Sequence, residues 1–211
     1  MSDAIPESVM VERIKHCLVR AIEMFNRKDV PTLLCPRKDE VGNDVAKGSS
    51  GWGAASERAI AHRLAVYLEY KLREDGIIQD SHPVVVDCEY NRHLQSQKVH
   101  QIPAELVSIV KDAKRTATPD SDDDGFYVFS IAPDIVVHER GSDRNNLLVV
   151  EVKKSTNREI PQYDRLKLEC FTDKTSGYGY KLGAAVTAED NVAPGDRRLL
   201  PPQWYSNGAA E

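Results

Sequence analysis

The sequence IAPDIVV (residues 131–137), followed after a short polar segment by LLVVEVKK (residues 147–154), determines the fold that we expect. Both stretches are rich in β-branched and other apolar residues, which favours β-strands. The residues between them, 140–146, contain glycine, serine, aspartate and asparagine, which favour a turn. We therefore predict two antiparallel neighbouring strands joined by a hairpin loop.

Each predicted strand also carries charge among its apolar residues. Side chains two residues apart on a strand share a face, so Glu151 and Lys153 are expected to project together. Charged groups in such a place cost several kcal/mol, at the order-of-magnitude level, unless they are paired or bind a metal. If Asp134 lies beside Glu151, two carboxylates converge on one point. Two such oxygen ligands, with room for water and a phosphate, suit Mg²⁺.

Helices are expected on the N-terminal side of these strands. Apolar residues at three- and four-residue spacing predict an amphipathic helix over residues 8–27, and a loop follows over 31–53. A second helix is predicted from the N-cap Ser56 to near Gly76. Glu57 begins the apolar stripe of that helix, so its carboxylate either points inward or only favours the helix dipole.

The remaining elements complete an α/β pattern. We predict a strand over residues 84–90, a short helix over 102–114, a helix starting at Pro161 and a strand over 180–187, and we expect an irregular tail from 193 to 211. This order indicates a mixed central sheet flanked by helices, with an extra N-terminal helix. We expect one domain, 1–211, with a core over about 56–187 and residues 1–55 as an N-terminal helix and loop.

Composition limits the possible classes of protein. The 211 residues carry a formal net charge of −5, which argues against a general binder of polyanions. The four cysteines form no Cys-x-x-Cys pair, and the chain shows no charged-then-apolar leader, so we expect a reduced, cytoplasmic protein. Mean hydropathy is −0.47 and no apolar stretch approaches the roughly 18 residues needed to cross a bilayer, so no membrane partner is expected.

Taken together, Pro133-Asp134, Glu151-x-Lys153 and the order of helices and strands resemble the PD-(D/E)XK nuclease superfamily, which has the restriction-endonuclease-like fold. The resemblance covers roughly residues 56–187 and implies a metal-dependent nuclease of a bacterial or phage-like setting. It implies that Asp134 and Glu151 hold Mg²⁺ or Mn²⁺, that the Val152 carbonyl adds a metal ligand, and that Lys153 acts on the attacking water. In many members a glutamate from the preceding helix contributes, and Glu57 matches it by position.

One branch of the superfamily does not match. Members that resemble RecB carry Gln and Tyr four residues apart on the helix after the lysine, whereas Gln162 is followed at that distance by Leu166. Basic residues just past the motif are expected either to contact backbone phosphates of a nucleic acid or to form a solvated helix face. The residues that we assign to nucleic-acid binding are Lys154, Arg158 and Lys167.

Other polar and aromatic residues near the motif have two interpretations each. His138 lies on the strand face of Asp134 and either borders the site or is a structural histidine. Asp87 and Glu89 share a strand face and pair either with Arg92 or with the site. Trp52 and Tyr90 each either stack on bases or pack in the core.

Three functions follow from these observations. The first is hydrolysis of DNA, with RNA a less favoured substrate, assisted by a homodimer partner or by a partner protein that delivers the substrate. The second is a catalytically silent protein of the same fold that binds nucleic acid or protein. The third is a metal-dependent hydrolase of a small phosphorylated substrate.

Overall fold

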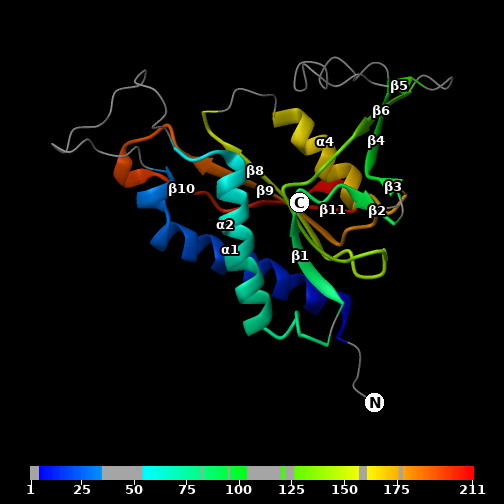
Figure 1. Ribbon diagram of the computed structural model, residues 1–211, viewed down its shortest axis with the longest axis horizontal. Helices are drawn as coiled ribbons and strands as arrows, with labels where there is room; N and C mark the ends of the chain where they lie inside the picture. The colour runs from blue at the N-terminus through cyan, green and yellow to red at the C-terminus, as the bar shows by residue number, and fades with distance from the viewer. Residues whose placement is uncertain are drawn as a thin grey trace. The chain divides into compact units, whose positions relative to one another are not determined.

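The computed structural model describes residues 5–34, 54–81, 83–94, 96–103, 120–121, 126–156, 161–175 and 178–211. Within them the chain is a mixed α/β protein built on a seven-stranded sheet with the order β1-β7-β8-β9-β11-β12, and β10 also pairs with β9 (Figure 1). The strands of this sheet are β1 (Val84–Cys88), β7 (Ile135–Glu139), β8 (Leu148–Lys154), β9 (Leu182–Glu189), β10 (Arg198–Leu199), β11 (Gln203–Ser206) and β12 (Ala209–Ala210).

The contacts divide the chain into two compact units. The first contains the chain up to Ile78, a segment that begins at Val152, and Val186–Pro202, and the second contains the other segments. Strands β8 and β9 supply residues to both units. The single domain that we expect for residues 1–211 stays a prediction.

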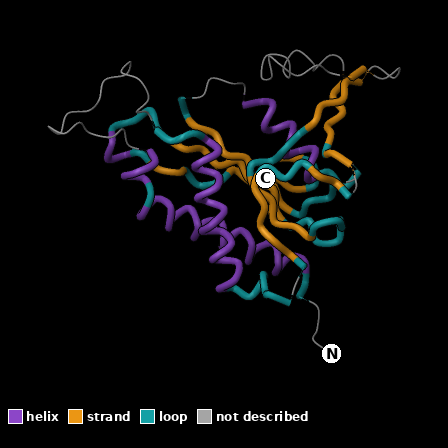
Figure 2. Tube along the Cα trace, viewed as in Figure 1, coloured by secondary structure: helices purple, strands orange, loops and turns teal. Residues whose placement is uncertain are grey.

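Two helices dominate the first unit. Helix α1 (Glu7–Lys28) and helix α2 (Glu57–Glu74) contact each other, and a short π-helix (Val30–Leu34) follows α1 (Figure 2). Their buried residues recur at helical spacing, and the Ser56 hydroxyl accepts the Ala59 N–H at 3.2 Å as an N-cap. Both predicted helices and the predicted cap are confirmed.

The hairpin at the centre of the sequence also forms as predicted. Strands β7 and β8 are antiparallel, with Ile135 opposite Val150 and Val137 opposite Leu148. Strand β1 pairs with the other edge of β7, also antiparallel. Ile135, Val137 and Val150 are β-branched, and all four of these residues are buried, as expected for strands in the middle of a sheet.

Helix α4 (Pro161–Thr172) connects β8 to β9. The Leu182 N–H donates to the Leu147 carbonyl, and the Ser155 N–H donates to the Ala188 carbonyl. The start of β8 is therefore joined to the start of β9, and the end of β8 to the end of β9, so the two strands are parallel. Parallel neighbours need a crossover connection, which α4 provides. The helix predicted from Pro161 and the strand predicted after it are confirmed, and the sheet is mixed.

Two smaller sheets lie between β1 and β7 in the chain. Strand β2 (Arg92–His93) pairs with β3 (Ser96–Gln97), and β6 (Phe126–Ser130) pairs with both β4 (Val99–Pro103) and β5 (Asp120–Ser121). The helix predicted over 102–114 is wrong at its start, because Ile102 and Pro103 belong to β4. Pairing with β6 overrides the local preference of Pro103 for a first helical turn. The rest of that prediction lies outside the described residues.

The C-terminal segment is not irregular, and that prediction is wrong. After a 3₁₀ turn (Pro194–Asp196), strand β10 pairs with β9, and β11 pairs with both β9 and β12. Tyr205 of β11 is 2% exposed and belongs to the core of the second unit. Gly183 allows this approach, because a Cβ there would lie 3.1 Å from the Tyr205 Cβ. Pro201 and Pro202 favoured the prediction of an irregular segment, although short strands form before and after them.

We expect Tyr205→Ala to lower the free energy of unfolding by about 3 kcal/mol, because it removes a buried ring from the core. Gln203→Ala, an exposed position on the same strand, is expected to change it by less than about 0.5 kcal/mol. Urea denaturation of both variants measures the difference. Equal values would mean that β11 does not stabilise the core.

A buried lysine lies in the second unit. Lys98 is 2% exposed, and its Nζ donates to the Tyr180 hydroxyl at 3.0 Å and to the Tyr90 carbonyl at 3.2 Å. The ammonium also lies 5.8 Å from the centre of the Phe171 ring. Burial lowers the pKa of Lys98 to about 8.

This shift predicts a pH dependence of stability. Between pH 8 and the ordinary lysine pKa the unfolded chain binds more protons than the folded one, so stability rises with pH. We expect the free energy of unfolding of the wild type to rise by about 1.5 kcal/mol more than that of Lys98→Met between about pH 8 and 9.5. Chemical denaturation at both pH values measures this, with Lys174→Met as a control that behaves like the wild type. Parallel pH curves for Lys98→Met and the wild type would contradict the lowered pKa.

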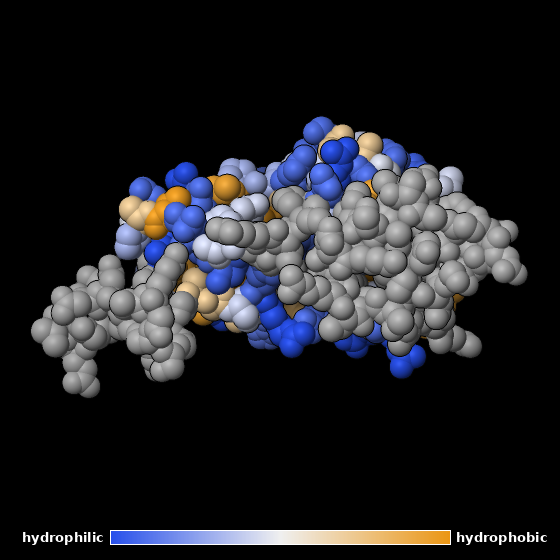
Figure 3. All heavy atoms as spheres, turned by 90° about the horizontal axis from the view of Figure 1, so that it is seen from above, coloured by the Kyte–Doolittle hydropathy of each residue, from blue (hydrophilic) through white to orange (hydrophobic). Residues whose placement is uncertain are grey.

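The outer surface of the described residues is mainly hydrophilic on the face shown in Figure 3. Large exposed apolar side chains include Val66 and Tyr70 of α2 and Leu94 of the β2–β3 hairpin. None of the helices in the described part of the chain combines the length and the apolar character needed to cross a bilayer.

Candidate active site

Asp134 and Glu151 lie just beyond the last pair of the β7–β8 ladder in the second unit, and the charge of Asp134 raises the pKa of Glu151. The β7–β8 ladder ends where Ile135 pairs with Val150, and the next residues beyond that pair are Asp134 and Glu151. Residues directly opposite on antiparallel strands share a face, with Cβ atoms about 5 Å apart. The Asp134 carbonyl also accepts the Glu89 N–H at 3.1 Å, which fixes the chain beside the end of β1.

The carboxylate of Glu151 is buried and asymmetric. It is 3% exposed, and its Oε2 accepts a hydrogen bond from Lys167 Nζ at 2.5 Å. Among the described residues, no donor reaches its Oε1. Burial raises the pKa of Glu151 to about 8, and the charges of Asp134 and Asp164 add to that rise against the opposing effect of Lys167.

Lys167 belongs to this buried group. Its Nζ lies 3.0 Å from Asp164 Oδ1 as well as 2.5 Å from Glu151 Oε2. Although burial lowers the pKa of Lys167, the two carboxylates outweigh burial and hold that pKa above its usual range, so the ammonium stays charged. Helix α4 places Asp164 and Lys167 one turn apart, and Tyr163 and Leu168 pack beside them in the core.

These residues fit a divalent cation. Asp134 and Glu151 offer two carboxylates at adjacent sheet positions, and Glu151 Oε1 is a buried acceptor that no described donor satisfies. Within the described ranges, no three side chains of His, Cys, Asp or Glu lie together in a way that could hold a metal by themselves. Magnesium requires fewer, because it usually keeps several waters and takes one or two carboxylates plus substrate phosphates. The Val152 carbonyl stays a predicted ligand.

The first unit places Glu57 against the end of β8. Glu57 Oε1 accepts the backbone N–H of Lys154 at 2.8 Å, and Glu57 Oε2 lies 3.5 Å from Lys153 Nζ. The Ser56 cap positions Glu57 as the first residue of α2. The inward orientation expected for Glu57 is present, and its partners are Lys153 and the backbone of β8.

The Asp190 side chain contacts the C-terminal end of β8 and the two residues that follow it. Its carboxylate accepts hydrogen bonds from Ser155 Oγ at 3.0 Å and Thr156 Oγ1 at 2.8 Å, and it lies 3.1 Å from Lys154 Nζ. These contacts keep the pKa of Asp190 below its usual range although burial opposes them. The chain just past the Glu-x-Lys motif is therefore anchored by side chains that the sequence did not identify.

The residues predicted to bind nucleic acid are placed differently. Lys167 is 7% exposed and points to Glu151, so the expected contact with a solvent-accessible phosphate is wrong for this residue. The physical reason is that Lys167 follows Tyr163 by four residues and lies on the buried side of α4. Lys154 is half-buried and paired with Asp190. Arg158 and Trp52 lie outside the described residues.

His138 and Asp87 form a separate pair on β7 and β1. His138 Nε2 lies 3.0 Å from Asp87 Oδ2, which also accepts the Arg140 Nε–H at 2.7 Å. Tyr90 packs edge-on against His138. Burial lowers the pKa of His138, so the ring is neutral near pH 7. These contacts support the structural interpretation of His138, with Arg140 as the partner of Asp87 where we had considered Arg92.

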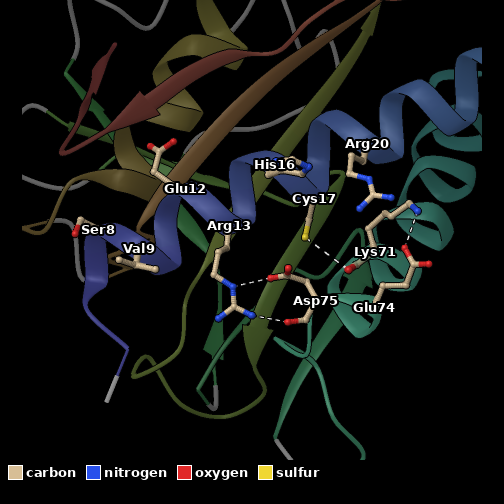
Figure 4. Close-up of a pocket in the computed structure, with 10 residues that line it drawn as sticks. All are labelled: Ser8, Val9, Glu12, Arg13, His16, Cys17, Arg20, Lys71, Glu74 and Asp75. Atoms are coloured by element: carbon tan, nitrogen blue, oxygen red, sulfur yellow. Dashed lines mark hydrogen bonds and ion pairs between the residues drawn. The ribbon is translucent and has the colours of Figure 1, made fainter. Parts of the chain in front are cut away.

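A groove of about 800 Å³ in the first unit contains none of the predicted site residues (Figure 4). It runs along α1 and the C-terminal end of α2. Arg13 pairs with Asp75 across it, Lys71 pairs with Glu74, and Cys17 Sγ contacts the Lys71 carbonyl. Its charged side chains therefore largely neutralise one another, and burial raises the pKa of Cys17 to about 11, which disfavours the thiolate near pH 7.

Comparisons with known proteins give no relative. The chain shows no significant similarity to any protein-family model, curated protein or solved structure. The functional assignment therefore depends on the motif and on the contacts described above.

Two acidic residues had no role assigned from the sequence, namely Asp164, which contacts Lys167, and Asp190, which contacts the end of β8. A signal existed for Asp164, since it stands three residues before Lys167 on a helix whose apolar stripe contains Tyr163. Charges beside such a stripe indicate a buried pair as readily as a solvated face. Asp190 gives no comparable signal, because its partners Thr156, Ser155 and Lys154 are 34 to 36 residues away in the chain.

Proposed function

We propose that this protein is a Mg²⁺-dependent or Mn²⁺-dependent nuclease of the PD-(D/E)XK type, with the restriction-endonuclease-like fold, that hydrolyses phosphodiester bonds in DNA. The observation that supports it best is the buried Glu151 carboxylate, which follows the last ladder residue of β8 while Asp134 precedes that of β7, and whose Oε1 receives no hydrogen bond from the described residues. A buried acceptor of this kind is costly unless a cation or a water molecule satisfies it.

The residues have distinct roles in this proposal. Asp134 and Glu151 hold the cation, which, when bound, neutralises charge on the scissile phosphate and lowers the pKa of a water molecule. Lys153 follows two residues after Glu151 on β8 and so projects to the same face of that strand. Glu57 accepts the Lys154 N–H and lies beside the Lys153 ammonium, so it orients that ammonium. Lys153 either positions the water or stabilises charge in the transition state.

The charge distribution bears on the substrate. Two of the three basic residues expected to contact phosphates, Lys154 and Lys167, are engaged with Asp190 and with Glu151 and Asp164. The formal net charge is −5, so an excess of Lys and Arg side chains for binding a long polyanion is lacking. This favours DNA delivered by a second copy or by a partner protein over tight binding by the isolated chain.

A panel of substrates and cations tests the proposal. Plasmid, single-stranded DNA and RNA are incubated with Mg²⁺, with Mn²⁺ and with a chelator, and we expect cleavage of DNA that stops on chelation and returns with added cation. The double variant Asp134→Ala/Lys153→Ala, purified in the same way, controls for contaminating nuclease, and Lys174→Ala, an exposed lysine, controls for loss of charge. Cleavage by the double variant at the wild-type rate would refute the proposal, and an inactive wild type would favour the catalytically silent binding protein.

A further inference from the structure

The buried charges of the second unit form a chain rather than an isolated pair. Asp164 contacts Lys167, and Lys167 contacts Glu151, with all three side chains less than 8% exposed. The two carboxylates both contact the one ammonium of Lys167. Helix α4 contributes two of the three residues, so its packing sets the position of the third.

The two oxygens of Glu151 are used differently. Lys167 binds Oε2 at 2.5 Å, whereas Oε1 is buried and receives no hydrogen bond from the described residues. A salt bridge that served stability alone would be expected to have its remaining lone pairs satisfied, because an unsatisfied buried oxygen is unfavourable. Glu151 Oε1 is therefore an acceptor that a cation or a water molecule can satisfy.

The type of ligand atom indicates the ligand class. Glu151 offers a buried carboxylate oxygen, and the charge of Asp134 acts on Glu151, so a second carboxylate lies near. Hard oxygen ligands of this type suit Mg²⁺ and Mn²⁺.

We propose that Lys167, itself fixed by Asp164, is a positioning residue that occupies Glu151 Oε2 and presents Oε1 alone to a divalent cation. Glu151 is then a monodentate ligand whose orientation is set before the cation arrives. This inference rests on the proposed function to the extent that Asp134 and Glu151 are taken as the cation ligands. It assigns to Lys167 a role in the site that excludes contact with the nucleic acid.

Binding of Mn²⁺ to the full chain, measured by calorimetry in the absence of substrate, tests this role. We expect Lys167→Met to weaken Mn²⁺ binding about tenfold or more, as loss of a partner that orients a metal ligand commonly does. Lys167→Arg retains a donor and a charge and is expected to bind Mn²⁺ within about threefold of the wild type. Asp134→Ala serves as the variant that lacks a ligand.

A purely structural Lys167 gives a different pattern. Lys167→Met would then unfold at lower denaturant concentration than the wild type but would bind Mn²⁺ with the same dissociation constant, and this result would overturn the inference. If Lys167→Met does not fold, Asp164→Asn replaces it, since the amide keeps an acceptor for Lys167 and removes the charge that fixes it. We expect that variant to bind Mn²⁺ several-fold more weakly, and unchanged affinity would again overturn the inference.

The outcomes separate the two proposals. Binding of Mn²⁺ by the wild type without hydrolysis of any substrate would contradict the nuclease proposal and leave the role of Lys167 standing. Hydrolysis by the wild type with equal Mn²⁺ affinity in Lys167→Met would contradict the role of Lys167 alone. A wild type that binds no Mn²⁺ would overturn the role of Lys167, because that role is defined by cation binding.

Discussion

Asp134→Asn is expected to slow hydrolysis of DNA about a thousandfold while making the metal-free protein more stable. The rate falls because the variant removes one of the two carboxylates proposed to hold the cation. A metal ion stabilises charge in the transition state by several kcal/mol, and a thousandfold loss of rate corresponds to about 4 kcal/mol. The gain in stability follows because Asp134 lies opposite the buried Glu151 and raises its pKa.

The pH dependence sharpens this prediction. The pKa of Glu151 in the folded protein, about 8, lies above its ordinary value of 4.5, so its contribution to stability is complete below pH 4.5 and is lost as pH rises through 8. Asp134→Asn removes one cause of that rise. We therefore expect the variant to gain about 1 kcal/mol over the wild type at about pH 8 in chelator, and much less near pH 5.

Denaturation in chelator and in Mg²⁺ measures both effects. Added Mg²⁺ should stabilise the wild type and not Asp134→Asn, because a ligand that binds only the folded state adds to stability. Asp196→Asn, an exposed position in the 3₁₀ turn, is the matched control and should behave as the wild type in every condition. If Asp134→Asn kept full activity, or lost stability at pH 8, Asp134 would be a structural residue.

Part of the candidate site could be predicted from the sequence. The hairpin and its charged ends were predictable, because strand alternation fixes which side chains share a face and β-branched residues mark the strands. The position of Asp134 beside Glu151 follows from one loop and one register. The inward orientation of the Glu57 side chain could be predicted from its place on the apolar stripe of α2. Its hydrogen bond with the Lys154 N–H could not be predicted.

What could not be predicted depends on contacts between distant segments. The burial of Lys167 depends on how α4 packs on β8, and a short helix with both polar and apolar residues is compatible with either orientation. The strands after residue 193 depend on pairing with β9, and their local sequence contains two prolines. Strand β4 is similar, since its pairing with β6 takes Pro103 into a strand. In each case tertiary contacts outweigh local propensity.

Lys153→Met is expected to lower the rate of DNA hydrolysis about 10²-fold to 10³-fold while leaving the dissociation constant for Mn²⁺ within about threefold of the wild type. Loss of one preorganised group that stabilises developing charge has effects of this size. The ammonium of Lys153 is not a metal ligand, so binding of the cation should survive. Asp134→Asn, by comparison, should lose both the activity and the affinity for Mn²⁺.

Glu57→Gln provides the matched comparison for Lys153. The amide oxygen can still accept the Lys154 N–H, but the negative charge 3.5 Å from Lys153 Nζ is lost. We expect a decrease in rate of about tenfold or less, because the ammonium stays in place without its orienting partner. A larger effect of Glu57→Gln than of Lys153→Met would mean that Glu57 acts on the cation directly.

Lys153→Arg separates the two roles that remain open for this lysine. Arginine keeps a positive charge at the end of the side chain but does not deprotonate in proteins, so it cannot serve as a base. If Lys153 acts by electrostatic stabilisation, Lys153→Arg should retain a rate at least tenfold above that of Lys153→Met. If Lys153 deprotonates the water, both variants should be equally slow, and the wild-type rate should rise with pH through the pKa of the lysine. Because Glu57 Oε2 lies 3.5 Å from Lys153 Nζ and orients the ammonium, we expect the electrostatic role.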